Sequence, residues 1–235
     1  MSNAEIDRVR NEYGRRAERY AGSDIYLRMN PANLFMVQQR QKALVHILRE
    51  SGIGRLDGRR ILEIGCGGGG VLLEFLEYGA SPELLHGIDL LEDRIAAARR
   101  LLPLAQLVVG NAQQLADPNG HFDLILQFTA FSSILDSAVK TDMAREMLRV
   151  LKKPSGVILW YDFWLNPTNP ETRGIRPAEI RALFPGCRYR FNRVTLAPPV
   201  ARRLVPISWI AAELLEKIKL LNTHYLVVIC PEPAS

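Results

Sequence analysis

Hydrophobic residues recur along the chain at two different spacings, and the spacing changes near residue 60. Before it, residues 4–20 form a charged segment with helical spacing, and a second helix is predicted from Pro31 to about Gly52. After it, short apolar runs alternate with amphipathic stretches. The runs predicted to be strands are RILEIGC, LLHGIDL, LAQLVVGNA, FDLILQF and GVILWYDF, and the stretches predicted to be helices are VLLEFLEYG, EDRIAAARRLL and MAREMLRVLKK. Alternation of this kind indicates a parallel sheet with helices on both faces.

The pattern changes again after residue 163. A proline-rich loop leads to a short helix at PAEIRALF, then to an alternating strand at CRYRFNRVTL, and over about 201–221 to an amphipathic helix. The segment THYLVVICP follows as a last strand. We therefore expect residues 1–52 to form an N-terminal helical lid, and residues 164–235 to form a C-terminal part whose cap helix is inserted between two paired edge strands.

Composition places the chain among ordinary globular proteins. Of its 235 residues, 48% are hydrophobic and 23% are charged, which excludes disordered, collagen-like and disulfide-scaffold chains. No apolar stretch reaches the roughly 18–20 residues of a membrane-spanning helix, and charges stand where a signal peptide has its apolar core. We therefore expect a cytoplasmic protein without a transmembrane span. Cys66, Cys187 and Cys230 are too widely spaced to suggest a zinc site or a disulfide framework, so no metal is expected.

Charge is distributed unevenly along the chain, whose net charge is +5. Residues 1–60 hold 12 basic and seven acidic side chains, residues 61–135 hold three and nine, and residues 136–235 hold 15 and nine. An acidic centre between basic flanks suits a cationic ligand held centrally, while the flanks meet something neutral or anionic. No run of Lys and Arg with interleaved aromatic residues occurs, so nucleic acid is not expected as a partner.

The segment EIGCGGGG, from Glu63 to Gly70, lies where a buried strand is predicted to turn into a helix. Glycines at such a turn let the backbone approach a ligand, and the first N–H groups of the helix are unpaired. Asp89 ends the next predicted strand, where a carboxylate can accept hydrogen bonds from both hydroxyls of a ribose. The pattern indicates a nucleoside-type cofactor. Because the glycines also satisfy GxGxxG, a nicotinamide-dependent oxidoreductase is an alternative, although no Tyr-x-x-x-Lys pair occurs.

Four ordered segments, ILEIGCGGG, GIDL, GNA at 110–112 and FDLILQF with LRVLKKPSGVIL, together resemble the class I S-adenosylmethionine-dependent methyltransferases. The stretch RGIRPAEIRALFPG and the WYDFW that precedes it resemble the bacterial small-molecule type of these enzymes. The first resemblance covers residues 60–163, the expected cofactor-binding core. It implies a single methyltransferase domain over residues 1–235 with a doubly wound, Rossmann-like α/β fold. That fold has a seven-stranded, mostly parallel sheet with an antiparallel last strand, together with N-terminal helices and a small helical cap. The cofactor would be S-adenosylmethionine and the product S-adenosylhomocysteine.

The resemblance also implies which residues hold the cofactor. Gly65, Gly67 and the backbone near them would hold the methionyl part and the ribose, and Cys66 is small enough to stand between them. Glu63 would bind the amino end directly or through water, and Asp89 would bind the ribose hydroxyls.

The adenine and the reacting methyl group would meet a second set of residues. Leu90 would pack on the adenine, and its edge would meet Asn111, Ala112 and Gln113. The family commonly has Asp where this chain has Asn111, but an amide can still accept from the adenine amino group and donate to a ring nitrogen. At the end of a central strand, Gln127 and Phe128 would face the methionine portion and the methyl group.

Catalytic and acceptor-binding residues are less directly indicated. Asp162, with Tyr161, follows a predicted strand and is the first candidate for a general base, although such an Asp can also simply cap the next turn. Candidates for contact with the acceptor stand in two exposed segments, where solvated side chains are the alternative. They are Tyr13 and Tyr20 near the N-terminus, and Arg173 and Arg176 in the proline-rich loop.

We therefore expect an S-adenosylmethionine-dependent methyltransferase that modifies an oxygen, or alternatively a nitrogen, of a small metabolite, which can be anionic or linked to a sugar or a lipid. The alternatives are the oxidoreductase and a protein that binds the cofactor without turnover. We expect a monomer or a homodimer. Arg202 and Arg203, beside the apolar face of the predicted cap helix, would also suit a membrane surface.

Overall fold

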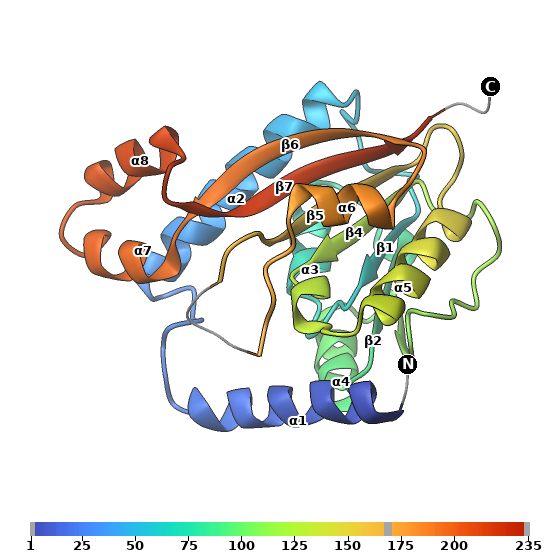
Figure 1. Cartoon of the computed structure of the whole chain (residues 1–235), viewed down its shortest axis with the longest axis horizontal. Coiled ribbons are helices and arrows are strands. Elements are labelled where there is room, and N and C mark those ends of the chain that lie inside the picture. Colours follow the sequence, from blue (N-terminus) through green and yellow to red (C-terminus); the bar gives the residue numbers. More distant parts are fainter. Residues whose placement is uncertain (1–2, 167–170, 233–235) are drawn as a thin grey trace.

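The computed structural model describes residues 3–166 and 171–232, and its elements follow the predicted order (Figure 1). The strands are β1 (Ile61–Ile64), β2 (Leu85–Asp89), β3 (Gln106–Val109), β4 (Leu124–Phe128), β5 (Val157–Phe163), β6 (Cys187–Leu196) and β7 (Asn222–Pro231). The helices are α1 (Asn3–Arg19), α2 (Pro31–Glu50), α3 (Gly70–Glu77), α4 (Glu92–Leu101), α5 (Ser137–Val150), α6 (Pro177–Leu183), α7 (Pro198–Leu204) and α8 (Trp209–Ile218).

The strands form one sheet in the order β3-β2-β1-β4-β5-β7-β6. Neighbouring strands from β3 to β5 are parallel, whereas β7 is antiparallel to both β5 and β6. The last strand thus enters the sheet between β5 and β6. The predicted fold, a seven-stranded, mostly parallel sheet with an antiparallel last strand, is confirmed.

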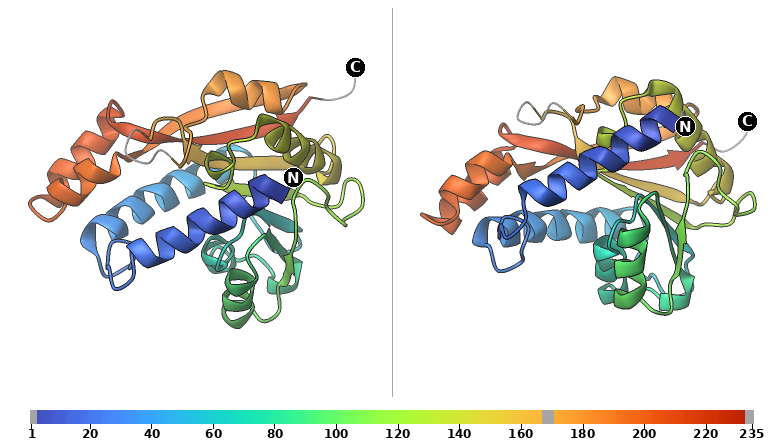
Figure 2. Two further views of the ribbon diagram at one scale, coloured as in Figure 1. Left: turned by 60° about the horizontal axis from the view of Figure 1, so that its bottom comes forward. Right: turned by 90° about the horizontal axis from the view of Figure 1, so that it is seen from below.

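Helices cover both faces of this sheet, and each face has its own buried cluster. Along β1, Leu62 and Ile64 point into the cluster that includes α5 and α6, whereas Ile61 points into the cluster that includes α2, α3 and α4. Side chains alternate across a strand, so the fully buried strand ILEI contributes apolar side chains to both clusters. Figure 2 shows the two helical layers with the sheet between them.

The N-terminal helix α1 lies along the edge where β1, β2 and β4 end (Figures 1 and 2), and its Val9 is buried in the cluster that includes α5 and α6. Its Val9 and Tyr13 line the same cavity as Ile64, Asp89 and Phe128, which stand at the ends of these three strands. Ligands of open α/β sheets collect at the carboxyl ends of the strands. The helix α1 therefore covers the place where a ligand is expected.

The cap differs from the single helix predicted over 201–221. It consists of two helices, α7 and α8, which are separated by a turn containing Pro206. Proline has no N–H for the helical hydrogen bond, and the hydroxyl of Ser208 accepts a hydrogen bond from the Ala211 N–H at 3.2 Å to start α8. The prediction of one helix was wrong because the apolar periodicity continues through this break.

Two further findings concern the start of helix α5 and the length of the helices. The helix predicted at MAREMLRVLKK starts earlier, at Ser137, because the Asp136 carboxylate accepts hydrogen bonds from the N–H groups of Ala138 and Val139 and caps it. Within residues 3–166 and 171–232, no helix is both long and apolar enough to span a bilayer.

Candidate cofactor and acceptor site

A cavity of about 390 Å³ lies at the carboxyl ends of the central strands, within the range of small-molecule binding sites. Three sets of residues line it. The sheet and its turns contribute Glu63, Ile64, Gly65, Cys66, Ile88, Asp89, Leu90, Leu91, Gly110, Asn111, Ala112, Phe128, Thr129, Ala130, Ser133 and Ile134. Helices of the core contribute Gly70, Val71, Glu74, Arg94 and Met143. The N-terminal helices and their connection contribute Val9, Tyr13, Tyr26, Arg28, Asn33, Val37 and Arg40.

The glycine turn after β1 has a backbone that only glycine adopts easily. Gly65 has a φ of +70°, and a Cβ there would lie 2.6 Å from the Cβ of Ala130. Such a contact is too short, and the positive φ is itself unfavourable for residues with a side chain. The turn therefore brings bare backbone to the cavity wall, as the sequence predicts for a ligand-binding loop.

The carboxylate of Asp89 joins the end of β2 to this turn. One oxygen accepts a hydrogen bond from the Gly67 N–H at 2.9 Å, and the other accepts one from the Leu91 N–H at 3.0 Å. Each carboxylate oxygen can accept a further hydrogen bond, so Asp89 can still bind hydroxyl groups in the cavity that it lines. Gly67 itself is not among the lining residues.

Glu63 is a deeply buried acidic group of the cavity wall, with 2% of its surface exposed. Its Oε2 is buried and has no hydrogen-bond partner in the described structure. Burial raises the pKa of this carboxyl, and the positive charge of Arg40 opposes that rise. A buried acceptor without a donor fits a cationic ligand group such as an ammonium.

The predicted adenine contacts reach the cavity in part. Leu90, Asn111 and Ala112 line it, but Gln113 does not. Instead, the side chain of Gln113 donates to the carboxylate of Asp142 at 2.9 Å, and its backbone N–H donates to Oδ1 of Asn111 at 3.0 Å. Gln113 therefore stabilises the loop from outside the cavity, whereas Asn111 is part of the cavity lining. Burial raises the pKa of Cys66, a lining residue, so its thiol stays protonated.

The structure does not bring Asp162 or Gln127 to the cavity wall. Asp162 is 1% exposed and accepts hydrogen bonds from the Gln127 side chain at 2.7 Å and from the N–H groups of Ser132 and Phe163. Burial raises the pKa of its carboxyl, and these donors oppose the rise. Phe128, the other residue predicted at this strand end, does line the cavity. Asp162 therefore fixes the loop after β4 from behind the site.

Tyr161 is also buried outside the cavity lining. Its hydroxyl lies 2.8 Å from Oγ1 of Thr195, and its ring stacks on His224 with centroids 4.7 Å apart. Burial raises the pKa of Tyr161 to about 12. Neither Tyr161 nor Asp162 is placed to remove a proton from a molecule in the cavity.

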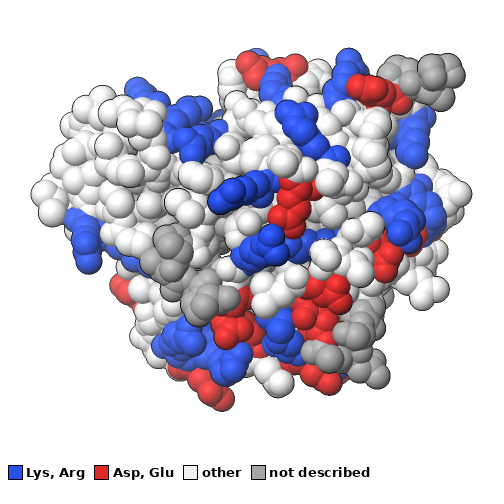
Figure 3. Space-filling view, in the orientation of Figure 1, with Lys and Arg blue, Asp and Glu red and all other residues white. Residues whose placement is uncertain are grey.

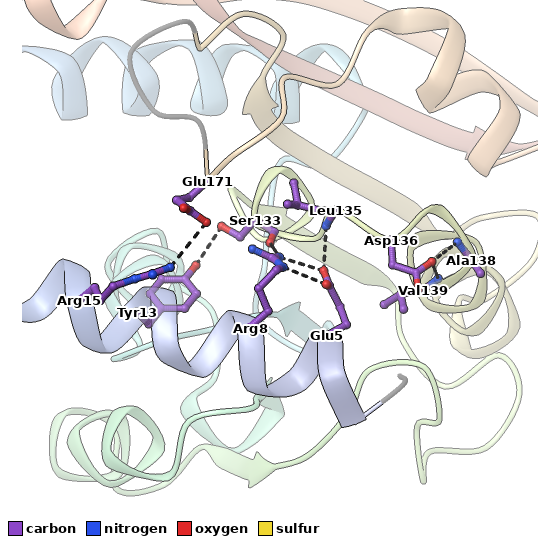
Figure 4. Close-up of polar contacts among 10 residues, drawn as sticks. All are labelled: Glu5, Arg8, Tyr13, Arg15, Ser133, Leu135, Asp136, Ala138, Val139 and Glu171. Atoms are coloured by element: carbon purple, nitrogen blue, oxygen red, sulfur yellow. Dashed lines mark hydrogen bonds and ion pairs between the residues drawn. The ribbon is translucent and has the colours of Figure 1, made fainter.

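Tyr13 of α1 lines the cavity and contacts two other lining residues, Ser133 and Arg94; Figure 4 shows its contact with Ser133. Its hydroxyl lies 3.2 Å from Oγ of Ser133, and the guanidinium of Arg94 lies 4.2 Å from the centre of its ring. Glu5 and Arg8, which pair with each other, bind the backbone of Leu135 and Ser133. These contacts tie α1 to the loop after β4, at the cavity.

The other predicted acceptor residues lie elsewhere. Tyr20 is outside the cavity lining and packs edge-on against Tyr26, which does line it, with ring centroids 5.3 Å apart. Arg173 and Arg176 are exposed, and neither lines the cavity.

Sequence reasoning missed a charged cluster made by Arg28, Arg40 and Glu74. Oε1 of Glu74 accepts hydrogen bonds from both guanidiniums, at 2.9 Å from Arg28 and 2.5 Å from Arg40. All three residues line the cavity, and Glu74 is 2% exposed. The guanidinium of Arg40 also lies 5.6 Å from the ring centre of Phe128. Since these residues are far apart in the chain, only the buried charge of Glu74 within an apolar helix could have signalled the cluster.

Together the residues of this wall fit a nucleoside-type cofactor with a cationic end. The orphaned oxygen of Glu63 offers an acceptor to an ammonium, the turn at Gly65 offers bare backbone, and Asp89 offers carboxylate oxygens. Within the described residues, His, Cys, Asp and Glu side chains form no cluster of three that could hold a metal ion.

Comparisons with known proteins agree with this geometry. Residues 61–156 match the family model described as a methyltransferase domain. A fatty-acid O-methyltransferase from Mycolicibacterium smegmatis is 37% identical over 109 residues, which are 46% of this chain and 38% of that protein. Ajmaline N-methyltransferase from Rauvolfia serpentina is 28% identical over 133 residues, which are 53% of this chain and 43% of that protein. The matched segments thus span less than half the length of these relatives.

Solved structures show the same fold at lower identity. A SAM-dependent methyltransferase from Archaeoglobus fulgidus superposes with a TM-score of 0.56 and 18% identity, covering 85% of this chain and 98% of that one. The similarity therefore extends beyond the matched core to most of the chain.

Proposed function

We infer that this chain is a class I S-adenosylmethionine-dependent methyltransferase, and we propose that it methylates an oxygen of a small anionic acceptor with an apolar part, with a carboxylate as the acceptor group. The observation that carries this proposal is the sharing of one Glu74 oxygen by Arg28 and Arg40 at the cavity wall.

On the cofactor side, S-adenosylmethionine supplies a methyl group on a positively charged sulfur. The carboxylate of Glu63 would accept hydrogen bonds from the amino group of the methionyl part, and the backbone at Gly65 would lie against that part. Asp89 would accept from the ribose hydroxyls while keeping its bond to the Gly67 N–H. Leu90 and Ala112 offer apolar contacts to the adenine.

On the acceptor side, the wall formed by α2 and the connection before it is basic and partly apolar. The guanidiniums of Arg28 and Arg40 carry two positive charges, and both bind the single negative charge of Glu74. When the Glu63 carboxylate binds the cofactor's amino group, one positive charge of this pair is left to bind an anionic acceptor. A guanidinium offers a planar fork to a carboxylate. Val37 and Phe128 line the same cavity and offer apolar contact. An anionic group attached to an apolar part suits this wall.

A carboxylate acceptor also agrees with the position of Asp162. Carboxyl groups have pKa values near 4, so at neutral pH a carboxylate oxygen attacks the methyl group without losing a proton. Such an acceptor needs no general base, and the buried Asp162 is not placed to act as one. The named activity of the Mycolicibacterium relative, methylation of a fatty acid on oxygen, supports the same acceptor class.

A nitrogen acceptor is the second candidate, because the relative from Rauvolfia serpentina is an N-methyltransferase. A neutral amine likewise needs no base. The two candidates differ in charge, so the basic wall favours the carboxylate.

The test is a methyl-transfer assay with S-adenosylmethionine and matched acceptors of equal chain length that end in a carboxylate, a hydroxyl or an amine. We expect a methyl ester, detected by mass spectrometry, from the carboxylate series. Arg28→Gln should raise KM for that series about tenfold or more and leave the dissociation constant of S-adenosylhomocysteine unchanged. The matched control is Arg173→Gln, an exposed arginine outside the cavity. Methylation of the amine alone, or a KM that Arg28→Gln does not change, would contradict the carboxylate assignment.

A further inference from the structure

Helix α8 has two apolar faces, and only one of them is packed. Its inner face carries Ala212, Leu215 and Trp209, and the Trp209 ring packs edge-on against Phe35 of α2 with centroids 5.2 Å apart. The outer face carries Ile210, Leu214 and Ile218, which are 72%, 57% and 58% exposed. Their spacing of four residues places them in one row along the helix.

This row is part of a larger exposed apolar surface, which we call the cap surface. It continues through the turn before α8 and the segment after it. Its apolar members are Ile207, Ile210, Leu214, Ile218, Leu220 and Leu221. A water-exposed helix face is normally polar, and contiguous apolar surface marks an interaction site.

The exposed charges around the cap surface are basic. They are Arg202, Arg203, Lys217 and Lys219. The acidic residues of α8 are engaged elsewhere: Glu213 pairs with Lys42 of α2 at 3.1 Å, and Glu216 accepts hydrogen bonds from the N–H groups of Thr195 and Leu196. In Figure 3 the lobe formed by α7 and α8, at the left, is mostly white with blue side chains at its edges.

The cap surface lies at the same end of the molecule as the connection between α1 and α2 (Figures 1 and 2). That connection lines the cavity with Tyr26 and Arg28, and between and after them it exposes Leu27 and Met29, which are 56% and 90% exposed. Arg202 of α7 lies near enough to Tyr26 to act electrostatically on its phenol. Leu27 and Met29 therefore stand beside one wall of the cavity, at the end of the molecule where the cap surface lies.

From this combination we propose that the cap surface docks the protein on a lipid bilayer that contains anionic lipids. An amphipathic helix with an apolar row and flanking Lys and Arg side chains lies in the interface of such a bilayer, with the row among the acyl chains and the cations near the headgroups. The charge of the rim, which is basic throughout its exposed members, selects an anionic surface. The proposal goes beyond the proposed methyl transfer and does not depend on it.

The test is co-sedimentation of the whole 235-residue chain with phosphatidylcholine vesicles, with and without about 30 mol% phosphatidylglycerol. We expect binding to the anionic vesicles that is at least about tenfold tighter than to the neutral ones and is weakened by about 0.5 M salt. The variant Ile210→Ser/Leu214→Ser should weaken binding about tenfold or more, since each buried methylene contributes to membrane affinity. The variant Arg203→Gln/Lys217→Gln should remove most of the preference for anionic lipid.

The matched control is Leu104→Ser/Val108→Ser, which removes two apolar side chains of similar exposure, 59% and 55%. Leu104 precedes the edge strand β3, and Val108 lies within it. This variant should bind vesicles as the unaltered protein does. Thermal unfolding of every variant shows that the fold is kept. The proposal is overturned if the unaltered protein ignores anionic vesicles, or if the α8 variant binds them unchanged. It is also overturned if the α8 variant only converts a dimer to a monomer, because the cap surface would then bind a second copy of the chain.

Discussion

The carboxylate of Asp89 accepts a hydrogen bond from the backbone N–H of Gly67 at 2.9 Å and so joins the end of β2 to the glycine turn after β1. The two residues are also the ones whose positions in the sequence indicate a ribose-binding acid and a ligand-binding loop. A substitution at Asp89 therefore changes both a ligand contact and the shape of the turn. The same coupling makes the turn a sensitive place to test the account.

Replacing Gly65 with Ala should damage both stability and cofactor binding. The positive φ costs about 1–2 kcal/mol for a residue with a side chain. In addition, the new Cβ would lie 2.6 Å from that of Ala130. Gly58→Ala is the matched control, because Gly58 has a φ of +78° but no atom within 4 Å of its virtual Cβ. We expect only Gly65→Ala to weaken binding of S-adenosylhomocysteine in calorimetry, and Ala130→Gly in the same chain to restore part of it. Equal effects of the two substitutions would show that close packing at Gly65 does not matter.

The variant Asp162→Asn separates a positioning residue from a general base. The carboxylate of Asp162 now accepts hydrogen bonds from Gln127, Ser132 and Phe163. The amide of Asn would point an N–H group at one of these donors, which should cost about 1–3 kcal/mol of stability. Loss of a general base lowers kcat by about 10²–10⁴-fold. We expect a lower unfolding temperature and a kcat within about tenfold of the unaltered enzyme. A fall of kcat into the larger range, in a variant with unchanged melting, would return Asp162 to the role of base.

Substitutions at Tyr13 test whether α1 completes the cofactor site. Tyr13→Phe keeps the ring beneath the Arg94 guanidinium and loses the contact with Ser133, whereas Tyr13→Ala loses both. We expect binding of S-adenosylhomocysteine to be weakened about tenfold in the Ala variant and about threefold or less in the Phe variant. Tyr20→Ala serves as the control, since Tyr20 does not line the cavity. If Tyr13→Ala bound as tightly as the control, α1 would not belong to the cofactor site.

His224 should make the stability of the protein depend on pH. Burial lowers its pKa from 6.5 to about 3, so the folded chain holds this ring neutral where the unfolded chain binds a proton. The contribution of His224 is thus fully present above pH 6.5 and is lost as the pH falls toward 3, by about 2 kcal/mol at pH 5.

The variant His224→Phe should remove this dependence while keeping an aromatic ring between Tyr161 and Phe163. Denaturant unfolding at pH 7.5 and pH 5 should show a difference about 2 kcal/mol smaller than in the unaltered protein. The exposed His46, replaced by Gln, should leave the difference unchanged. The same pH dependence in the Phe variant would mean that other groups cause it.

The parts of the fold and site that the sequence predicts correctly are those that depend on residues close together in the chain. The strand–turn–helix from Glu63 to Gly70 and the acid at Asp89 each depend on neighbours in sequence, so the pattern identifies them. The two cap helices were missed because the apolar periodicity continues through Pro206, whereas the helical backbone is interrupted there.

The placement of side chains at the strand ends was predicted less well. Gln127 is fully buried, and its side chain donates to Asp162 at 2.7 Å outside the cavity lining. The resemblance suggested that both Gln127 and Phe128 reach the cavity, and only Phe128 lines it. The cluster of Arg28, Arg40 and Glu74 joins residues far apart in the chain. Its members come from the connection before α2, from α2 and from α3, so the cluster depends on how these segments pack together.

Calorimetric titration of the protein with S-adenosylhomocysteine, beside NADH and with Asp89→Ala as the comparison, decides whether this cavity binds the methyl donor. We expect a single saturable site for S-adenosylhomocysteine, affinity weakened about tenfold or more in Asp89→Ala, and no heat from NADH. Absence of binding up to about millimolar S-adenosylhomocysteine, or preferential binding of NADH, would contradict the assignment of this cavity to S-adenosylmethionine.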